Sequence, residues 1–200
     1  MVLRWIAIVL GCLIVGLYIL LPVGMGIAAV IPGREAVDSP PMGFEPVELE
    51  TEDGISLSAW YAPPTNGAAI VLLHGAGGSR EQVRPYADML TRHGYGVLAL
   101  DLRGHGMSAG QTNRLGWQST ADVKAAVDYL QAQEGVDQVG GLGLSMGGEV
   151  LLGAVSEVAA LRAAVADGAT RRSTQELLAL PSERSLMPSR WMLLPCQGRA

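Results

Sequence analysis

The stretch V-G-G-L-G-L-S-M-G-G-E at residues 139–149 decides the fold, because it predicts a strand, a sharp turn and a helix in close succession. Ser145 stands between Gly143 and Gly147, and the spacing G-x-S-x-G is typical of a turn that lifts one hydroxyl clear of the backbone. Side chains at the two flanking positions would collide with neighbouring backbone, so glycine is favoured there. The pattern makes Ser145 a candidate nucleophile; the alternative is a glycine-rich turn with a surface serine.

Two earlier stretches predict buried parallel strands that end in glycine loops. Residues 68–79 read A-A-I-V-L-L-H-G-A-G-G-S, and residues 96–108 read G-V-L-A-L-D-L-R-G-H-G-M-S. Continuous apolar runs of this kind are typical of strands covered on both faces. Helical spacing over residues 81–93 and 119–133 separates the strands, so the sequence predicts alternating strands and helices in a mostly parallel sheet.

Three motifs, H-G-A-G-G, D-L-R-G-H-G-M-S and G-L-S-M-G-G, resemble those of the α/β-hydrolase family in order and spacing. The nearest likeness is to the esterases, lipases and aminopeptidases that carry D-x-R-G-x-G-x-S after the fourth strand, and it covers residues 45–168. The resemblance implies an α/β-hydrolase-type, mostly parallel sheet with helices on both faces. It also implies hydrolysis of a carboxylic ester or amide through an acyl-enzyme on Ser145.

The same resemblance assigns partners to Ser145. It implies that the backbone N–H groups of Met146 and Ala76 form the oxyanion hole, with Gly75 as the nearest alternative. Asp167, at the end of the predicted strand at 162–168, is the candidate acid, although it is alternatively a simple strand-end residue. Asp101 is expected to be structural.

The catalytic histidine is the missing part. All three histidines, His74, His93 and His105, precede Ser145, whereas the family places its base after the last strand. His74 is expected to shape the oxyanion loop, with a role as the base as the alternative, and the other two are expected to be structural. The triad is therefore incomplete. The sequence predicts an impaired serine hydrolase, and the alternative is a non-catalytic remnant or interaction protein.

The composition excludes several other classes of protein. A net charge of −5 offers no basic surface, so no nucleic-acid partner is expected. The glycine loops lack the G-x-G-x-x-G pattern with a following acid that a dinucleotide site requires. We expect no cofactor and no metal, and a small ester or amide as the substrate.

Residues 1–33 predict a transmembrane signal anchor, because residues 5–33 contain no charged side chain. Pro22 and the glycines that follow it are expected to kink or end the helix. A cleaved signal peptide is the alternative, with Gly26-Ile-Ala28 as a passable cleavage site. The positive charges at the two ends, Arg4 and Arg34, favour a cytoplasmic N-terminus only slightly. We expect a single-pass protein that contacts membrane lipid and has an extracytoplasmic domain.

The rest of the chain divides into three predicted parts. Residues 34–45 are proline-rich and predict an extended tether, and residues 46–168 predict a partial hydrolase domain that begins with a hairpin over 47–61. Residues 169–200 form an atypical tail with one helix expected at 173–180 and no strand, so the family's last two strands are lacking. A truncated gene or a shifted reading frame would explain this tail.

An incomplete sheet leads to an expectation of self-association. Val71, Leu73, Leu98 and Leu142 are expected to be poorly covered on one face, and the edge at 162–167 is expected to be open. Exposed apolar patches and unpaired strand edges both promote association.

Overall fold

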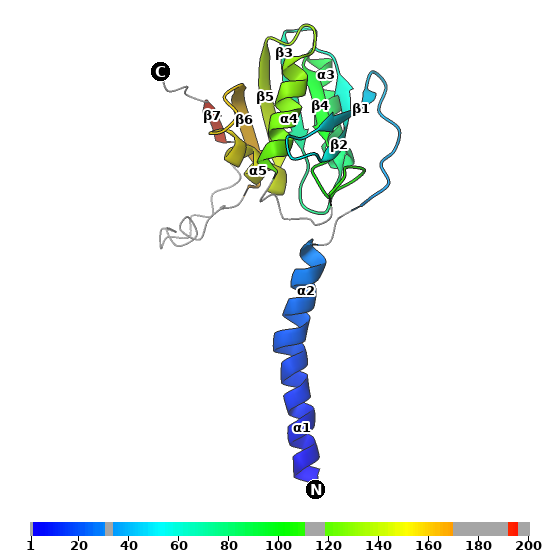
Figure 1. Ribbon diagram of the computed structural model, residues 1–200, viewed down its shortest axis with the longest axis vertical. Helices are drawn as coiled ribbons and strands as arrows, with labels where there is room; N and C mark the ends of the chain where they lie inside the picture. Colours follow the sequence, from blue (N-terminus) through cyan, green and yellow to red (C-terminus); the bar gives the residue numbers. More distant parts are fainter. Residues whose placement is uncertain (1, 31–33, 111–118, 170–191, 196–200) are drawn as a thin grey trace. The chain divides into compact units, whose positions relative to one another are not determined.

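A computed structural model describes residues 2–30, 34–110, 119–169 and 192–195 (Figure 1). The chain divides into two compact units, Met1–Ile31 and Pro32–Ala200. The first is helical, and the second contains the whole sheet.

The first unit runs as α1 (Val2–Val15), a π-helical turn (Gly16–Leu20) and α2 (Leu21–Val30). Pro22 lacks an N–H and its ring crowds the carbonyl four residues earlier. Directly before it, Leu21 N–H donates to the carbonyl of Gly16, five residues back, which widens the turn. The helix therefore continues beyond Pro22 to Val30, and the expectation that it could end at 22–26 is wrong.

This helix is long and apolar enough to cross a bilayer. The candidate span Arg4–Ala28 has 25 residues and a mean hydropathy of 2.8, and none of its most apolar window is buried against protein. A hydrocarbon core needs about 20 apolar residues in a helix. An N-terminal signal sequence has the same properties, so length and composition fit both functions.

The second unit is one mixed sheet with helices on both sides. In chain order its elements are β1 (Glu45–Glu50), β2 (Ser56–Ala62), β3 (Ala68–Leu73), the 3₁₀ turn η2 (Arg80–Val83), α3 (Arg84–Arg92), β4 (Gly96–Leu100), α4 (Thr120–Gln131), β5 (Gln138–Leu144), α5 (Met146–Ala154), β6 (Leu161–Asp167) and β7 (Met192–Pro195). The strand order is β1-β2-β4-β3-β5-β6-β7. The four neighbouring strands β4, β3, β5 and β6 are parallel, and β1, β2 and β7 pair antiparallel. The predicted hairpin and parallel strands are confirmed.

Alternating side chains of the central strands fill two cores. Val71 and Leu73 of β3 pack in one core with residues of α4 and α5, whereas Leu72 between them packs in the other core with Trp60 of β2 and with α3. The helices cover opposite faces because strands with apolar residues at every position need both faces removed from water. The carboxyl ends of the parallel strands then meet at one edge, where their loops collect.

The expected gap in this cover lies elsewhere. Val71, Leu73 and Leu98 are fully buried, because they face the side that α4 and α5 cover, and Leu142 is only 8% exposed. On the α3 face, by contrast, the parallel strands carry three half-buried apolar side chains that pack on the core: Ile70, Leu144 and Val165. The expectation of self-association therefore depends on these three residues.

The edge of β6 is also not open. The described part of the tail contains β7, which pairs antiparallel with β6 from Ala163↔Pro195 to Ala166↔Met192. The expectation of no strand after residue 168 is wrong. The run M-L-L-P is too short to show the alternation that predicts a strand, and it forms one because the unpaired backbone groups of the β6 edge offer hydrogen-bond partners. The helix expected at 173–180 lies outside the described residues.

The predicted tether packs on the sheet unit. Arg34 Nη2 donates to Gly110 O at 2.9 Å, and Asp38 N–H donates to Glu81 Oε1 at 3.1 Å. Val37 is half-buried against the core around Trp60. The described residues of this segment are thus attached at several points. Burial of the Val37 side chain stabilises the attached conformation over an extended one that leaves the side chain in water.

Val37→Ser should lower the stability of the sheet unit by about 1 kcal/mol, because it removes half-buried methyl groups from the Trp60 core. For a domain of this size such a loss lowers Tm by roughly 2–4 °C. Met42→Ser is the matched control, since Met42 is fully exposed in the same segment. Thermal unfolding of both variants in detergent measures the difference. Equal midpoints would show that the segment is a tether after all.

Candidate active site

Ser145 sits in a strained turn at the carboxyl end of β5. Its φ of 48° is the only positive value at a non-glycine residue within the described ranges, and its ψ is −114°. Such a conformation costs about 1–3 kcal/mol and persists only where the surroundings enforce it. Ser145 N–H donates to Asp167 O at 2.7 Å, which fastens the turn to β6. The side chain is exposed, so the strain presents one hydroxyl to solvent.

The flanking glycines are required by close backbone approach. A Cβ on Gly143 would lie 2.3 Å from the carbonyl of Gly147, and a Cβ on Gly147 would lie 2.6 Å from the carbonyl oxygens of Leu73 and His74. Backbone atoms on three packed elements cannot move aside as a flexible side chain can. The steric reason expected for G-x-S-x-G is therefore confirmed in the structure.

The start of α5 and the loop after β3 both lie next to the serine. Met146 is the first residue of α5, so its N–H has no acceptor within the helix. The loop after β3 approaches from the other side, since a Cβ on Gly75 would lie 3.5 Å from Ser145 Cβ. Gly75 N–H itself donates to Gln82 Oε1 at 2.6 Å, whereas within the described residues nothing accepts from Ala76 N–H. Within the described residues, the N–H groups of Met146 and Ala76 are thus without a hydrogen-bond acceptor.

His74 is fully buried and both of its ring nitrogens are engaged. Nε2 accepts from Leu102 N–H at 3.1 Å, so the proton is on Nδ1, which donates to Gly75 O at 2.7 Å. Burial lowers the pKa of His74 to about 4, which keeps the ring neutral. The side chain joins the loop after β3 to the loop after β4, and it has no nitrogen left to take a proton from Ser145.

The other two histidines do not reach the serine. His105 is 1% exposed, its ring centroid lies 4.9 Å from that of His74, and its Nδ1 is 3.1 Å from Arg103 O. Burial lowers the pKa of His105. His93 ends α3, where its Nδ1 is 2.8 Å from Met89 O. Their geometry fits the structural roles expected for them.

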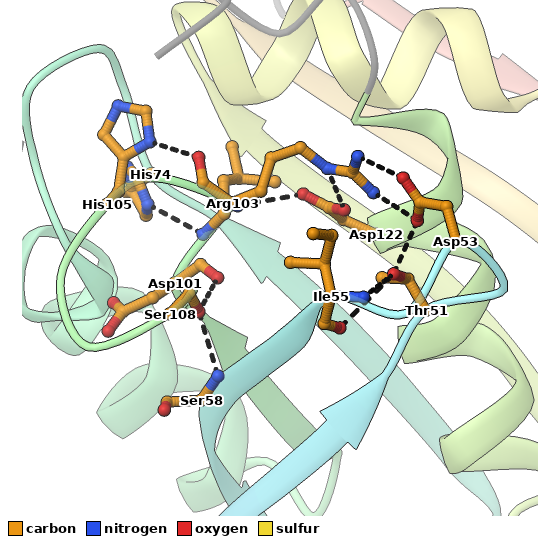
Figure 2. Close-up of polar contacts among 11 residues, drawn as sticks. Thr51, Asp53, Ile55, Ser58, His74, Asp101, Arg103, His105, Ser108 and Asp122 are labelled. Atoms are coloured by element: carbon orange, nitrogen blue, oxygen red, sulfur yellow. Dashed lines mark hydrogen bonds and ion pairs between the residues drawn. The ribbon is translucent and has the colours of Figure 1, made fainter. Parts of the chain in front are cut away.

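The loop after β4 is built on the buried carboxylate of Asp101 (Figure 2). Its oxygens accept from Arg80 N–H at 2.6 Å and Met107 N–H at 2.9 Å. Ser108 Oγ donates to Asp101 O at 2.5 Å and accepts from Ser58 N–H at 2.9 Å. Burial raises the pKa of Asp101, although these donors oppose the rise. The aspartate and the serine of D-x-R-G-x-G-x-S thus organise the loop.

The arginine of this motif joins three segments (Figure 2). Arg103 Nε donates to Asp122 Oδ1 of α4 at 2.7 Å, and its Nη atoms donate to Asp53, in the β1–β2 turn, at 2.7 and 3.0 Å. Hydrogen bonds from Arg103 and Thr51 hold the pKa of Asp53 below its usual range. Burial raises the pKa of Asp122 to about 6 in spite of the guanidinium.

Asp167 lies beside the turn, because β6 is the parallel neighbour of β5 and Leu144 pairs with Asp167. Its side chain is half-buried at the edge where the loops collect. In the described part of the chain, no histidine lies between this carboxylate and Ser145 to form a triad. The same part shows no group of three His, Cys, Asp or Glu side chains arranged to hold a metal.

Three polar residues at this edge were not predicted from the sequence. Gln82 holds Gly75, and Asp53 and Asp122 hold Arg103. The D-x-R-G motif could have suggested a buried acidic partner for its arginine. Nothing around Gln82 distinguishes it from a surface residue of a helix, so its contact is visible only in three dimensions.

Comparisons with known proteins agree with this geometry. The family model described as serine aminopeptidase, S33, matches residues 64–193. An uncharacterised protein of Mycobacterium tuberculosis is 35% identical over 112 residues, and the thiohydrolase aneE of Aspergillus aculeatus is 32% identical over 117 residues. These alignments cover 54% and 56% of this chain.

Solved structures give the same result. The esterase Pf2001 of Pyrococcus furiosus superposes with a TM-score of 0.66 at 33% identity, covering 70% of this chain and 56% of its own. A serine hydrolase of Xanthomonas campestris without a lid shares the fold, with a TM-score of 0.53, 23% identity and coverage of 62% and 61%. The chain spans only 39% and 37% of the length of the mycobacterial protein and the thiohydrolase.

Arg103→Met should destabilise the sheet unit by about 3–5 kcal/mol at pH 8, because it leaves the Asp122 carboxylate buried without its partner. The folded pKa of Asp122 is raised above its unfolded value, so its ionisation destabilises the fold as the pH rises through about 6. Loss of Arg103 raises that pKa further. The variant's deficit should therefore be smaller at pH 5 than at pH 8.

Urea unfolding at both pH values measures this difference. Adding Asp122→Asn to the variant should remove the pH dependence. Lys124→Met is the control, since its ion pair with Asp128 is half exposed and should contribute little. A deficit in Arg103→Met that is equal at the two pH values would contradict the role given to Asp122.

Proposed function

This chain belongs to the serine aminopeptidase S33 family of the α/β-hydrolase superfamily, and we propose that it is a serine hydrolase that cleaves a carboxylic ester or amide through Ser145. The observation that carries the proposal is the strained, exposed conformation of Ser145 at the start of α5, next to the loop after β3. The names of two similar proteins, an esterase and a thiohydrolase, support hydrolysis of an acyl group.

In the proposed reaction, Ser145 Oγ attacks the carbonyl carbon and loses its proton to a base. The oxygen of the tetrahedral intermediate becomes an anion, which the N–H groups of Met146 and Ala76 stabilise. Collapse of the intermediate expels the alcohol or amine and leaves an acyl group on Ser145. Water then attacks the acyl-enzyme and releases the acid.

The described residues include no side chain placed to accept the proton of Ser145. His74 uses both ring nitrogens, and His93 and His105 lie in the structural positions described above. Asp167 lies where it could orient a histidine, and we propose it as the acid of the site. We propose that the 200-residue chain is an impaired catalyst, because an oxyanion hole without a base supplies only part of the acceleration.

The alternative function is a non-catalytic α/β-hydrolase-like scaffold that binds another molecule. The observation in its favour is the full engagement of His74, the histidine nearest to the serine in the fold. The two functions differ in the reactivity of Ser145, since a scaffold has no need of an activated hydroxyl.

A fluorophosphonate probe should label the chain at Ser145, and Ser145→Ala should abolish the labelling without a change in Tm, because the exposed hydroxyl contributes little packing. Turnover of an activated ester should remain at trace level, since a serine hydrolase that lacks its base retains only about 10³–10⁴-fold acceleration over water. Mass spectrometry of the labelled peptide and an ester assay measure the two quantities. Absence of label at Ser145 would favour the scaffold, and rapid hydrolysis of an ordinary ester would show that a base is in place.

We further propose that the N-terminal helix is an uncleaved signal anchor, that it contacts membrane lipid, and that the sheet unit lies outside the cytoplasm. The 25-residue apolar span supports membrane insertion. Arg4 is the first residue of the span, and the acidic residues beyond Arg34 count little in setting the orientation, so the support for this orientation is slight.

The anchor should keep the whole chain in the membrane fraction after extraction at alkaline pH, with Arg4 still present in the mature protein. Leu13→Arg combined with Leu17→Arg should release it, since each arginine at a helix centre costs about 2.5–3.5 kcal/mol on insertion. Protease added outside the cell should digest the sheet unit. A soluble mature chain that begins after Ala28 would identify the helix as a cleaved signal sequence.

A further inference from the structure

The short turn η2 is anchored firmly at its first residue. Arg80 N–H donates to the buried Asp101 carboxylate at 2.6 Å, and the Arg80 guanidinium lies 3.3 Å from the same carboxylate. The guanidinium also lies 5.2 Å from the centroid of the buried Trp60 ring. A segment held by a buried ion pair and a ring contact has little freedom to move, so the side chains that follow Arg80 start from a fixed backbone.

Gln82, two residues later, extends over the loop after β3. Its Oε1 accepts from Gly75 N–H at 2.6 Å. The same oxygen would lie 3.0 Å from a Cβ on Gly78, so the glycine at 78 leaves the room that the amide occupies. Gly78 N–H in turn donates to Gly75 O at 3.2 Å, which closes the loop into a turn.

Gly75 is therefore fixed through both of its backbone polar groups. Its N–H is held by Gln82, and its carbonyl accepts from His74 Nδ1 in the protein interior at 2.7 Å. In a trans peptide the carbonyl of one residue and the N–H of the next point in opposite directions. Because the carbonyl of Gly75 points to the buried His74 ring, the N–H of Ala76 points away from the interior.

We propose that Gln82 is a positioning residue for the oxyanion hole: by holding Gly75 N–H it fixes the peptide before Gly75, while His74 holds the peptide after it through Gly75 O, and together they present Ala76 N–H beside Ser145. This inference deepens the proposed hydrolase function and rests on it. Gln82 acts only through the loop, because its amide oxygen accepts from Gly75 rather than from a substrate. The choice between Gly75 and Ala76 as the second donor is thereby decided in favour of Ala76.

The test compares two substitutions in the full chain. Gln82→Met keeps the length of the side chain but removes the acceptor, and Gln82→Glu keeps an acceptor oxygen. Gln131→Met, on the exposed side of α4, is the control for loss of a surface amide. Hydrogen exchange of peptides that cover the loop after β3 measures the Gly75 contact, and the kinetics of Ser145 labelling by a fluorophosphonate measure the oxyanion hole.

We expect Gln82→Met to raise amide exchange in the loop and to slow the maximal labelling rate by roughly 10-fold or more, short of the 10²–10³-fold loss seen when a donor is removed outright. The probe concentration for half-maximal rate should stay unchanged, because these donors act in the transition state. Gln82→Glu should restore the exchange protection, and Gln131→Met should behave as the unmodified chain.

Exchange and labelling that are both unchanged in Gln82→Met would overturn the proposal, as would a slower rate that is matched by a lower Tm and a weaker probe affinity. If the unmodified chain fails to label at Ser145, the proposed hydrolase function fails with the donor assignment. Hydrogen exchange then still tests the hydrogen bond between Gln82 and Gly75. Raised amide exchange in Gln82→Met supports that hydrogen bond, and unchanged exchange overturns it.

Discussion

The structure depends on one close approach of backbone to backbone. The first turn of α5 lies directly against the ends of β3 and β5, so that neither Gly143 nor Gly147 has space for a Cβ. Contact at this distance fixes the direction in which the helix leaves the strand, and it forces Ser145 to a φ of 48°. The same contact brings the β3 loop within reach of the serine, so the nucleophile and the oxyanion donors follow from a single packing constraint.

Buried polar side chains then hold the surrounding loops in place. Loops have few apolar residues to pack, and their backbone groups need partners when they lie against the core. His74 joins two loops, Asp101 closes the β4 loop on itself and onto η2, and Arg103 joins that loop to a hairpin turn and to α4. None of these groups faces the serine. They account for polar residues in the glycine motifs that catalysis does not use.

The predictable part of the molecule is the part encoded over short distances. The elbow, the strands and the hairpin follow from runs and spacings within about a dozen residues, and the structure confirms them. The unpredicted contacts join residues distant in sequence: Val37 with the core of Trp60, Arg103 with Asp53, and β6 with β7. No periodicity reports such pairs, because each side of the contact is an ordinary surface residue or a short apolar run. Pro22 is a different case. Proline normally ends a helix, but the π-helical turn directly before Pro22 lets this helix continue.

The same distinction applies to the chemistry. Oxyanion stabilisation needs only backbone N–H groups at the ends of β3 and β5, and these strands are adjacent in the sheet. General-base catalysis needs a side chain from a third, more distant segment. The two contributions are therefore separable in a folded chain: the proposed oxyanion donors belong to the described residues, and among those residues no side chain is placed to remove the proton of Ser145. Attack of Ser145 on a fluorophosphonate and attack on an ester both require loss of the hydroxyl proton, so both reactions need the second contribution to reach full rate. Slow labelling of Ser145 and slow turnover are thus compatible properties of one site, and together they would identify the proton-transfer step as the limit.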